Sequence, residues 1–299
     1  MRILILGGEG MLGHKVFQKL HLRFDTYVTF RDTNGLWVHH PVYDGIDRSH
    51  TLGGINALDF DGLERVMLKV KPDAVVNCIG IVKQRDEAKA AIPSIQINSL
   101  FPHQLANLCE KSGARLIHLS TDCVFSGIRG DYSESDWPDP IDLYGRTKLL
   151  GELNRPGCLT LRTSIIGWEL KQYASLLEWF ALQHGRIIKG YRKAIYTGLS
   201  TITLAILIGD LIETRPDLSG IYHVASTSIS KYDLLLRMQV ILNWKDISIE
   251  PDDDFHCDRS LIGTSFSKAT GWQAPEWDAM VKGLAEEWPL YEQWRRSVL

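Results

Sequence analysis

The chain has 299 residues, and 33 Lys and Arg against 36 Asp and Glu give a formal net charge of −3. It is 44% hydrophobic and 23% charged, which is typical of soluble globular proteins and excludes an intrinsically disordered chain. No apolar run approaches the roughly 20 residues that a membrane span needs. The near-neutral charge gives no electrostatic basis for general nucleic-acid binding.

The N-terminal sequence and the cysteines indicate the compartment. Residues 1–7, Met-Arg-Ile-Leu-Ile-Leu-Gly, start a strand at once, and no apolar region with a cleavage site precedes them. The five cysteines are odd in number and lack Cys-x-x-Cys spacing, which indicates reduced thiols rather than a disulfide framework or a zinc site. We therefore expect a cytoplasmic protein without a bound metal.

The first half of the chain alternates apolar β-rich runs with helical patterns. Strands are predicted over residues 2–6, 27–30, 74–79 and 115–119, and helices over 11–20, 60–69 and 102–111, with an irregular loop at 34–56. Continuous apolar runs are typical of parallel strands that helices cover on both faces. The alternation therefore predicts an α/β fold with a Rossmann-like, doubly wound parallel sheet.

Beyond residue 162 the pattern becomes mixed and predicts a smaller lobe. Helices are expected over residues 173–184 and 201–213, a strand over 221–224, and a solvated acidic turn at 252–254. We expect residues 1–163 and 197–225 to form a dinucleotide-binding domain. Residues 164–196 and 226–299 are expected to form a mixed α/β, substrate-binding lobe.

Gly7, Gly10 and Gly13 directly follow the first predicted strand and begin a helix. Glycines at this place allow a tight turn and let the backbone approach a pyrophosphate, which the helix N-terminus then faces with free N–H groups. The cofactor type depends on the end of the second strand, where the sequence reads Arg31-Asp32. Arg31 favours the 2′-phosphate of NADP(H), whereas the adjacent Asp32 leaves NAD(H) open.

Tyr144 and Lys148 are four residues apart in a helical stretch and therefore share one helix face. A neighbouring ammonium lowers the pKa of a tyrosine, so the pair predicts an acid that gives a proton to a carbonyl oxygen as hydride arrives. The Tyr-x-x-x-Lys pair alone occurs easily by chance. The pair becomes significant because Ser120-Thr121-Asp122 precedes it at the end of the fourth predicted strand, where ligands bind in open α/β sheets.

These motifs, in this order, resemble the extended short-chain dehydrogenase/reductase superfamily, and within it the dTDP-4-dehydrorhamnose reductase family. The resemblance spans nearly the whole chain, and its most specific part is residues 132–152. Other residues and segments that match the family are Lys71–Cys78, Asn98, Leu161-Arg162-Thr163-Ser164, Tyr196-Thr197-Gly198 and Ala269-Thr270-Gly271-Trp272. The resemblance implies NAD(P)H-dependent reduction of the keto group of a nucleotide-activated 4-keto-6-deoxy sugar, in deoxysugar or surface-polysaccharide biosynthesis. The resemblance is also compatible with a homodimer.

The resemblance also implies roles for individual residues. A catalytic triad would comprise Thr121, Tyr144 and Lys148. The cofactor would contact Gly7, Gly10, Met11, Leu12, Arg31, Asp59, Phe60, Cys78, Ile79 and Gly80, together with Tyr144 and Lys148. The nucleotide-sugar would contact Asp122, Cys123, Thr197, Gly198 and Arg259. Leu12, Phe60 and Ile79 equally suit an apolar core, and Asp59 suits a helix N-cap.

Two departures from the family pattern keep alternatives open. Cys123 and Ile165 stand where the rhamnose enzymes have aromatic residues that would face the sugar. A cysteine at the first of these positions resembles GDP-fucose synthase, an epimerase/reductase, although no histidine aligns with that enzyme's second acid/base group. The superfamily also includes a non-catalytic regulatory subunit associated with methionine adenosyltransferase, against which the intact Thr121, Tyr144 and Lys148 argue.

Overall fold

A seven-stranded parallel sheet forms the centre of the computed structural model, which describes residues 1–33, 40–83 and 89–298. In spatial order its strands are β10 (Gly220–His223), β6 (Cys158–Thr163), β5 (Arg115–Thr121), β4 (Ala74–Asn77), β1 (Arg2–Leu6), β2 (Asp25–Thr29) and β3 (Thr51–Leu52). The sheet is built outward in both directions from β1, which confirms the predicted doubly wound α/β fold. The order reverses between β1 and β4, so their carboxyl ends mark the expected ligand site.

Helices cover both faces of this sheet, because successive strand side chains point to opposite sides. Ile3 and Ile5 of β1 belong to one apolar core, and Leu4 and Leu6 belong to the other. The first core includes side chains of α1 (Gly13–Leu20) and α7 (Thr201–Thr214), and the second those of α2 (Phe60–Val70) and α4 (Phe101–Ser112). Further helices are α3 (Ala91–Ser94), α5 (Leu143–Leu150) and α9 (Thr264–Thr270).

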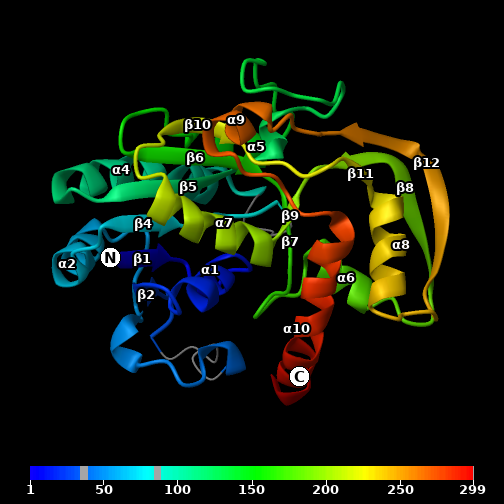
Figure 1. The fold of residues 1–299 in the computed structure, drawn as a ribbon, viewed down its shortest axis with the longest axis horizontal. Coiled ribbons are helices and arrows are strands. Elements are labelled where there is room, and N and C mark those ends of the chain that lie inside the picture. Colours follow the sequence, from blue (N-terminus) through cyan, green and yellow to red (C-terminus); the bar gives the residue numbers. More distant parts are fainter. Residues whose placement is uncertain (34–39, 84–88, 299) are drawn as a thin grey trace.

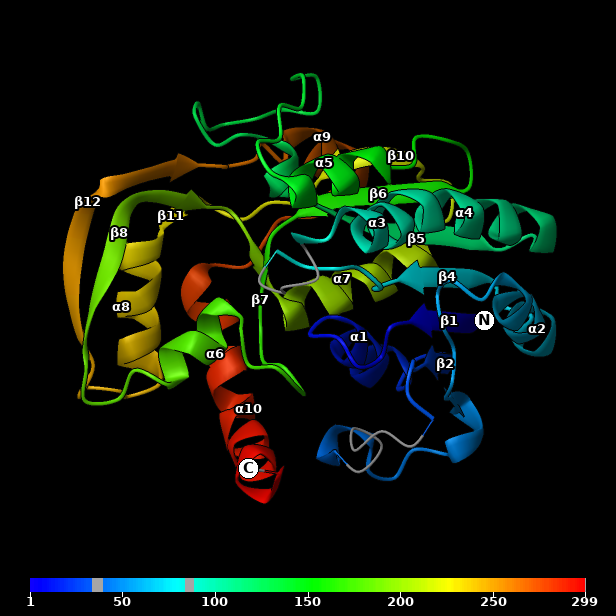
Figure 2. The same cartoon turned by 180° about the vertical axis from the view of Figure 1, so that it is seen from behind.

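A smaller, mixed sheet lies at the end of the molecule remote from α2 and α4, as both ribbon views show (Figure 1, Figure 2). Its strands are β11 (Ile229–Ser230), β8 (Ile187–Tyr196) and β12 (Ser248–Asp258), with β11 antiparallel and β12 parallel to β8. Helices α6 (Leu176–Ala181) and α8 (Lys231–Ile241) accompany it. The short parallel pair β7 (Ile165–Ile166) and β9 (Leu199–Ser200) lies where the chain passes between the two sheets.

The final helix, α10 (Trp277–Val298), joins the two parts of the molecule. Tyr291 of α10 bonds His14 of α1, with 2.6 Å between its hydroxyl oxygen and Nε2, and Glu287 pairs with the almost fully buried Lys15 at 2.8 Å. The indole of Trp168 donates to the Leu284 carbonyl at 2.8 Å. Among the described residues, no helix combines the length and the apolar character that a bilayer crossing requires.

The structure differs from the sequence-based predictions of secondary structure at three places. The predicted loop at 34–56 contains the edge strand β3, which pairs with β2; residues 34–39 of that range lie outside the described part of the chain. β6 was not predicted, because Arg162 interrupts its apolar pattern. The expected acidic turn at 252–254 belongs to β12, where Lys189 and Arg192 of the neighbouring strand pair with Asp252 and Asp253.

Candidate active site

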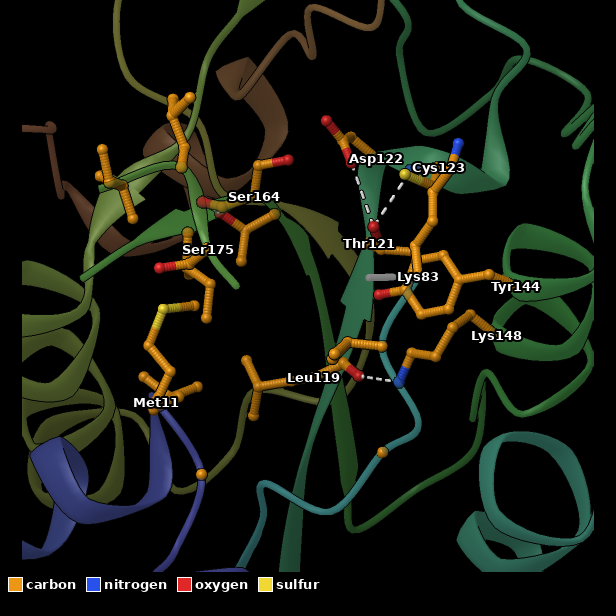
Figure 3. A pocket seen from close by; sticks show the side chains of 18 of the residues that line it. Met11, Lys83, Leu119, Thr121, Asp122, Cys123, Tyr144, Lys148, Ser164 and Ser175 are labelled. Atoms are coloured by element: carbon orange, nitrogen blue, oxygen red, sulfur yellow. Dashed lines mark hydrogen bonds between the residues drawn. The ribbon is translucent and has the colours of Figure 1, made fainter. Parts of the chain in front are cut away.

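One cavity of about 500 Å³ brings the sequence motifs together. Its lining includes the glycine turn, the polar segment after β5, the first turns of α5 and residues of the smaller sheet. In Figure 3, Met11 of the glycine turn lies across the cavity from Tyr144 and Lys148. The cavity therefore lies at the carboxyl ends of the central strands, where the strand order reverses.

The glycine turn fits the close approach of a dinucleotide. Gly7 adopts a φ of 89°, in the left-handed region that favours glycine, and its carbonyl accepts from Gly10 N–H at 3.1 Å. A Cβ on Gly13 would overlap the Gly7 carbonyl oxygen. α1 can therefore begin tightly against β1 only with glycine at this position. Leu12 has no side-chain cap bond at the start of α1, so the helix N-terminus can serve an anion.

Thr121, Tyr144 and Lys148 converge on this cavity. The Thr121 hydroxyl donates to Asp122 Oδ1 at 3.0 Å and accepts from the backbone N–H of Cys123 at 3.1 Å. Tyr144 lies in the first turn of α5 and Lys148 one turn later, where its ammonium donates to the Leu119 carbonyl at 2.6 Å. A helix and the adjoining strand end therefore place a hydroxyl, a phenol and an ammonium around one space.

Backbone packing fixes α5 in this position. Asp142 caps the helix by accepting from Gly145 N–H at 2.8 Å. A Cβ on Gly145 would overlap the Cys123 carbonyl, so glycine lets α5 lie directly against the segment after β5. Lys83 pairs with the other oxygen of the Asp142 carboxylate at 2.7 Å. The helix N-terminus is thereby held from two sides.

Burial determines the protonation of the two central groups. It raises the pKa of Tyr144, and the neighbouring Cys123 adds to the rise while the hydrogen-bonded Thr121 hydroxyl opposes it. Burial lowers the pKa of Lys148 to about 8, against the attraction of Glu152. The predicted lowering of the Tyr144 pKa is thus wrong in sign for this structure. The reason is that burial, the largest cause of the shift, cannot be deduced from helix spacing.

Cys123 and Arg259 form the wall of the cavity beyond the Thr121 hydroxyl. Arg259 donates to the carbonyls of Phe125 at 2.9 Å and Ser126 at 3.3 Å, and its Nη1 lies 3.7 Å from Cys123 Sγ. Burial raises the pKa of the Cys123 thiol to about 12. The thiol is therefore neutral at physiological pH, while the guanidinium joins the chain just after β12 to the segment after β5.

The predicted binding residues divide into two groups. Most line the cavity: Gly10, Met11, Leu12, Cys78, Ile79, Gly80, Asp122, Cys123 and Arg259. The others lie outside its lining: Gly7, Arg31, Asp59, Phe60, Thr197 and Gly198. Within the described residues, no group of three or more His, Cys, Asp or Glu side chains is placed to hold a metal ion.

Four predicted binding residues outside the lining have structural tasks. Asp59 caps α2 by accepting from Gly62 N–H at 3.0 Å, and Phe60 packs against Phe101. Thr197 accepts from the backbone N–H of Leu261 at 3.1 Å. A Cβ on Gly198 would overlap the ring of Tyr196. These residues stabilise the helices and segments around the cavity and do not form its wall.

Sequence reasoning missed a large part of the cavity wall, including Glu9, Lys171 and Tyr196. Glu9, within the glycine turn, accepts from the backbone N–H groups of Arg31 at 2.7 Å and Asp32 at 3.2 Å, and it pairs with Lys171. The place of Glu9 inside the motif could have drawn attention to it. Lys171 lies in a distant segment that no local pattern marks, whereas Tyr196 stands in the segment Tyr196-Thr197-Gly198, of which only Thr197 and Gly198 were predicted as site residues.

Comparisons with known proteins agree with this arrangement. A family model described as the RmlD substrate binding domain matches residues 1–245. Beta subunits of methionine adenosyltransferase 2 match too; that of Bos taurus is 30% identical over 181 residues, covering 57% of this chain and 48% of that protein. The match therefore spans about half the length of these curated relatives. A probable low-salt glycan biosynthesis reductase of Haloferax volcanii is 26% identical over 238 residues, covering 76% and 75% of the two chains.

Solved structures share the fold. A hypothetical dTDP-4-dehydrorhamnose reductase of Sulfolobus tokodaii superposes with a TM-score of 0.73 at 25% identity, covering 94% of this chain and 99% of that one. A dTDP-4-dehydrorhamnose reductase of Clostridium acetobutylicum gives 0.77 at 21% identity, with 97% and 100% covered. Since the family model matches most of its length, the chain belongs to the RmlD substrate-binding-domain family, and it has a Rossmann-like α/β fold.

Proposed function

We propose that this protein is an NAD(P)H-dependent reductase of the keto group of a nucleotide-activated 4-keto-6-deoxy sugar. The observation that carries the proposal is the convergence of Thr121, Tyr144 and Lys148 on the cavity that the glycine turn also lines. In this proposal residues 1–163 and 197–225 bind the cofactor, and residues 164–196 and 226–299 bind the substrate.

The proposed mechanism assigns a proton to Tyr144. When bound at the glycine turn, the reduced nicotinamide supplies a hydride to the carbonyl carbon. Because burial raises its pKa, Tyr144 keeps its proton at neutral pH and donates it to the carbonyl oxygen. Thr121 holds that oxygen in position, and the Lys148 ammonium, one helical turn away, stabilises the phenolate that remains.

The cofactor preference depends on the end of β2. Neighbours of the same fold include a dTDP-4-dehydrorhamnose reductase of Bacillus anthracis in complex with NADP and a dTDP-glucose 4,6-dehydratase in complex with NAD. We propose NADP(H), through Arg31 and a 2′-phosphate, with NAD(H) as the other candidate. The Glu9 carboxylate at the Arg31 N–H opposes a second anion there, so KM values for NADPH and NADH should be compared directly.

The activity is tested by the loss of NADPH absorbance with several 4-keto-6-deoxy nucleotide-sugars. We expect NADPH consumption that depends on one of these substrates, and one reduced sugar as the product by NMR. Cofactor binding without consumption on any substrate would contradict the reductase proposal. It would favour a non-catalytic subunit, the second candidate, which the methionine adenosyltransferase relatives support. Co-elution with a methionine adenosyltransferase tests that candidate.

Lys148 gives the reduction an expected pH dependence. With a pKa lowered to about 8, its ammonium is present below that pH and is lost above it. We therefore expect kcat/KM for reduction to fall as the pH rises through about 8. Lys148→Arg should lower the rate but remove this fall, because a guanidinium stays protonated. An unchanged profile in the Arg variant would assign the fall to another group.

Cys123 separates simple reduction from epimerisation followed by reduction. Its thiol lines the cavity, but a pKa of about 12 makes it a weak source of base at neutral pH. We expect Cys123→Ser to keep at least half of the turnover. We also expect wild-type product formed in deuterated water to carry no deuterium at the sugar C3 or C5, by NMR. Deuterium at either carbon, lost in the Ser variant, would show that Cys123 acts as an acid/base.

A further inference from the structure

A lysine from the segment between β7 and α6 reaches the glycine turn. The Lys171 ammonium pairs with the carboxylate of Glu9, which lies inside that turn. Both residues line the cavity, and 39% of the Lys171 side chain is exposed, so a molecule bound in the cavity can reach it. The proposed mechanism uses neither of these two charges.

The backbone around Lys171 is held in an unfavourable conformation. Gln172 and Tyr173 have φ values of 75° and 49°, in the left-handed region, although neither is glycine. On the other side of Lys171, the Leu170 carbonyl accepts from the indole N–H of Trp294 at 3.2 Å. Strained backbone persists only where its surroundings fix it, and it occurs most often at sites that bind or react. The segment therefore holds the ammonium at a defined place.

This place is the end of β2. One oxygen of the Glu9 carboxylate, Oε1, accepts from the backbone N–H groups of Arg31 at 2.7 Å and Asp32 at 3.2 Å, just after β2. The other oxygen, Oε2, accepts from the Lys171 ammonium. In dinucleotide-binding folds the residues at this strand end meet the 2′ group of the adenosine ribose. The Lys171 ammonium thus lies beside the expected position of that group.

The charges at this position favour a phosphate over a hydroxyl as the 2′ group. Burial opposes ionisation of Glu9, but the Lys171 ammonium and the two backbone N–H groups hold the pKa of its carboxyl below the ordinary value. Alone, this carboxylate would repel a phosphate, and the ammonium cancels its charge. Within the described residues, Glu9 is the only group that bonds Lys171. An ammonium has three N–H donors, so two remain for phosphate oxygens.

We propose that the Lys171 ammonium donates hydrogen bonds to the 2′-phosphate of NADP(H) and, together with Arg31, makes the protein prefer NADP(H) to NAD(H). This inference rests on the proposed function, which supplies the dinucleotide. The cofactor preference then depends on a residue far along the chain from β2, and the end of β2 alone does not determine it.

The test is Lys171→Met, which keeps an unbranched side chain and removes its charge. Dissociation constants for NADPH and NADH are measured by fluorescence titration without sugar. We expect the wild type to bind NADPH more tightly than NADH. The variant should bind NADPH about tenfold more weakly and NADH within about twofold of the wild type, which also shows that it is folded. An equal loss for both dinucleotides would place the ammonium at the diphosphate and overturn the proposal, as would a wild type that prefers NADH.

A second pair of variants separates direct contact from neutralisation of Glu9. Glu9→Gln removes the negative charge but keeps an oxygen for the backbone N–H groups of Arg31 and Asp32. In this background, Lys171→Met should still weaken NADPH binding about tenfold. If the double variant binds NADPH as tightly as Glu9→Gln alone, Lys171 only cancels the charge of Glu9, and the proposed contact is wrong.

Lys189→Met is the matched control. Lys189 also joins an accessible ammonium to a buried carboxylate, that of Asp252 at 2.8 Å, but it lies on β8 outside the cavity lining. We expect its NADPH affinity to equal that of the wild type. A loss as large as that of Lys171→Met would assign the effect to net charge and overturn the inference. A wild type that binds neither dinucleotide would contradict the proposed function itself, and the inference with it.

Discussion

Tyr144→Phe is expected to lower kcat for carbonyl reduction by roughly 10²- to 10⁴-fold, the usual contribution of a positioned general acid. The phenol lines the cavity together with Thr121 and keeps its proton because burial raises its pKa. Phenylalanine preserves the ring and its packing but leaves the developing alkoxide without a proton donor. The measurement is single-turnover oxidation of NADPH in the presence of saturating 4-keto nucleotide-sugar.

The comparison must show that the variant still binds its ligands. NADPH affinity, measured by fluorescence titration, should stay within about twofold, because the removed oxygen contributes to the transition state rather than to cofactor binding. Tyr191→Phe is the matched control, since Tyr191 is exposed on β8 and lies outside the cavity lining. Full turnover in the Tyr144 variant would remove the assigned acid from the mechanism.

Glu152→Gln is expected to give the largest loss of stability, about 3–5 kcal/mol in the free energy of unfolding. Glu152 and Arg162 form an ion pair at 2.7 Å, with only 4% and 5% of their side chains exposed. The same carboxylate accepts from Ser120 at 2.6 Å. An uncharged amide would leave the buried guanidinium without a counter-charge. Urea unfolding followed by circular dichroism measures the change.

Glu110→Gln provides the control at the protein surface. Glu110 pairs with Arg155 at 3.2 Å, but 77% of its side chain is exposed, so solvent weakens the attraction. We expect its substitution to change the free energy of unfolding by less than about 1 kcal/mol. Equal losses in the two variants would mean that burial does not determine the strength of the Glu152 pair.

The sequence predicted those parts of the fold that depend on local patterns. β1, β4 and β5 are apolar runs buried on both faces, and the glycine turn follows β1 directly, so spacing alone located them. β6 escaped prediction because its Arg162 is neutralised by Glu152 ten residues earlier. β12 escaped because its carboxylates pair with basic residues on β8, more than sixty residues away.

In the candidate site, too, local patterns were predictable and contacts between distant segments were not. The order of Thr121, Tyr144 and Lys148 along the chain predicted that the three residues act in one catalytic site. All three line one cavity. The sign of the Tyr144 pKa shift was not predictable, because it depends on burial by distant segments. Tyr196 reaches the cavity only because the smaller sheet brings β8 there.

The bonds between α1 and α10 have a consequence for biosynthesis. Lys15 is 1% exposed, and its counter-charge, Glu287, is translated more than 270 residues later. Until then the Lys15 ammonium has the neutral Gln18 amide beside it but no counter-charge, which is unfavourable in an apolar core. The N-terminal part of the chain should therefore stay incompletely packed on the ribosome until α10 has been made. Fragments that stop before α10 should aggregate rather than yield a smaller folded protein.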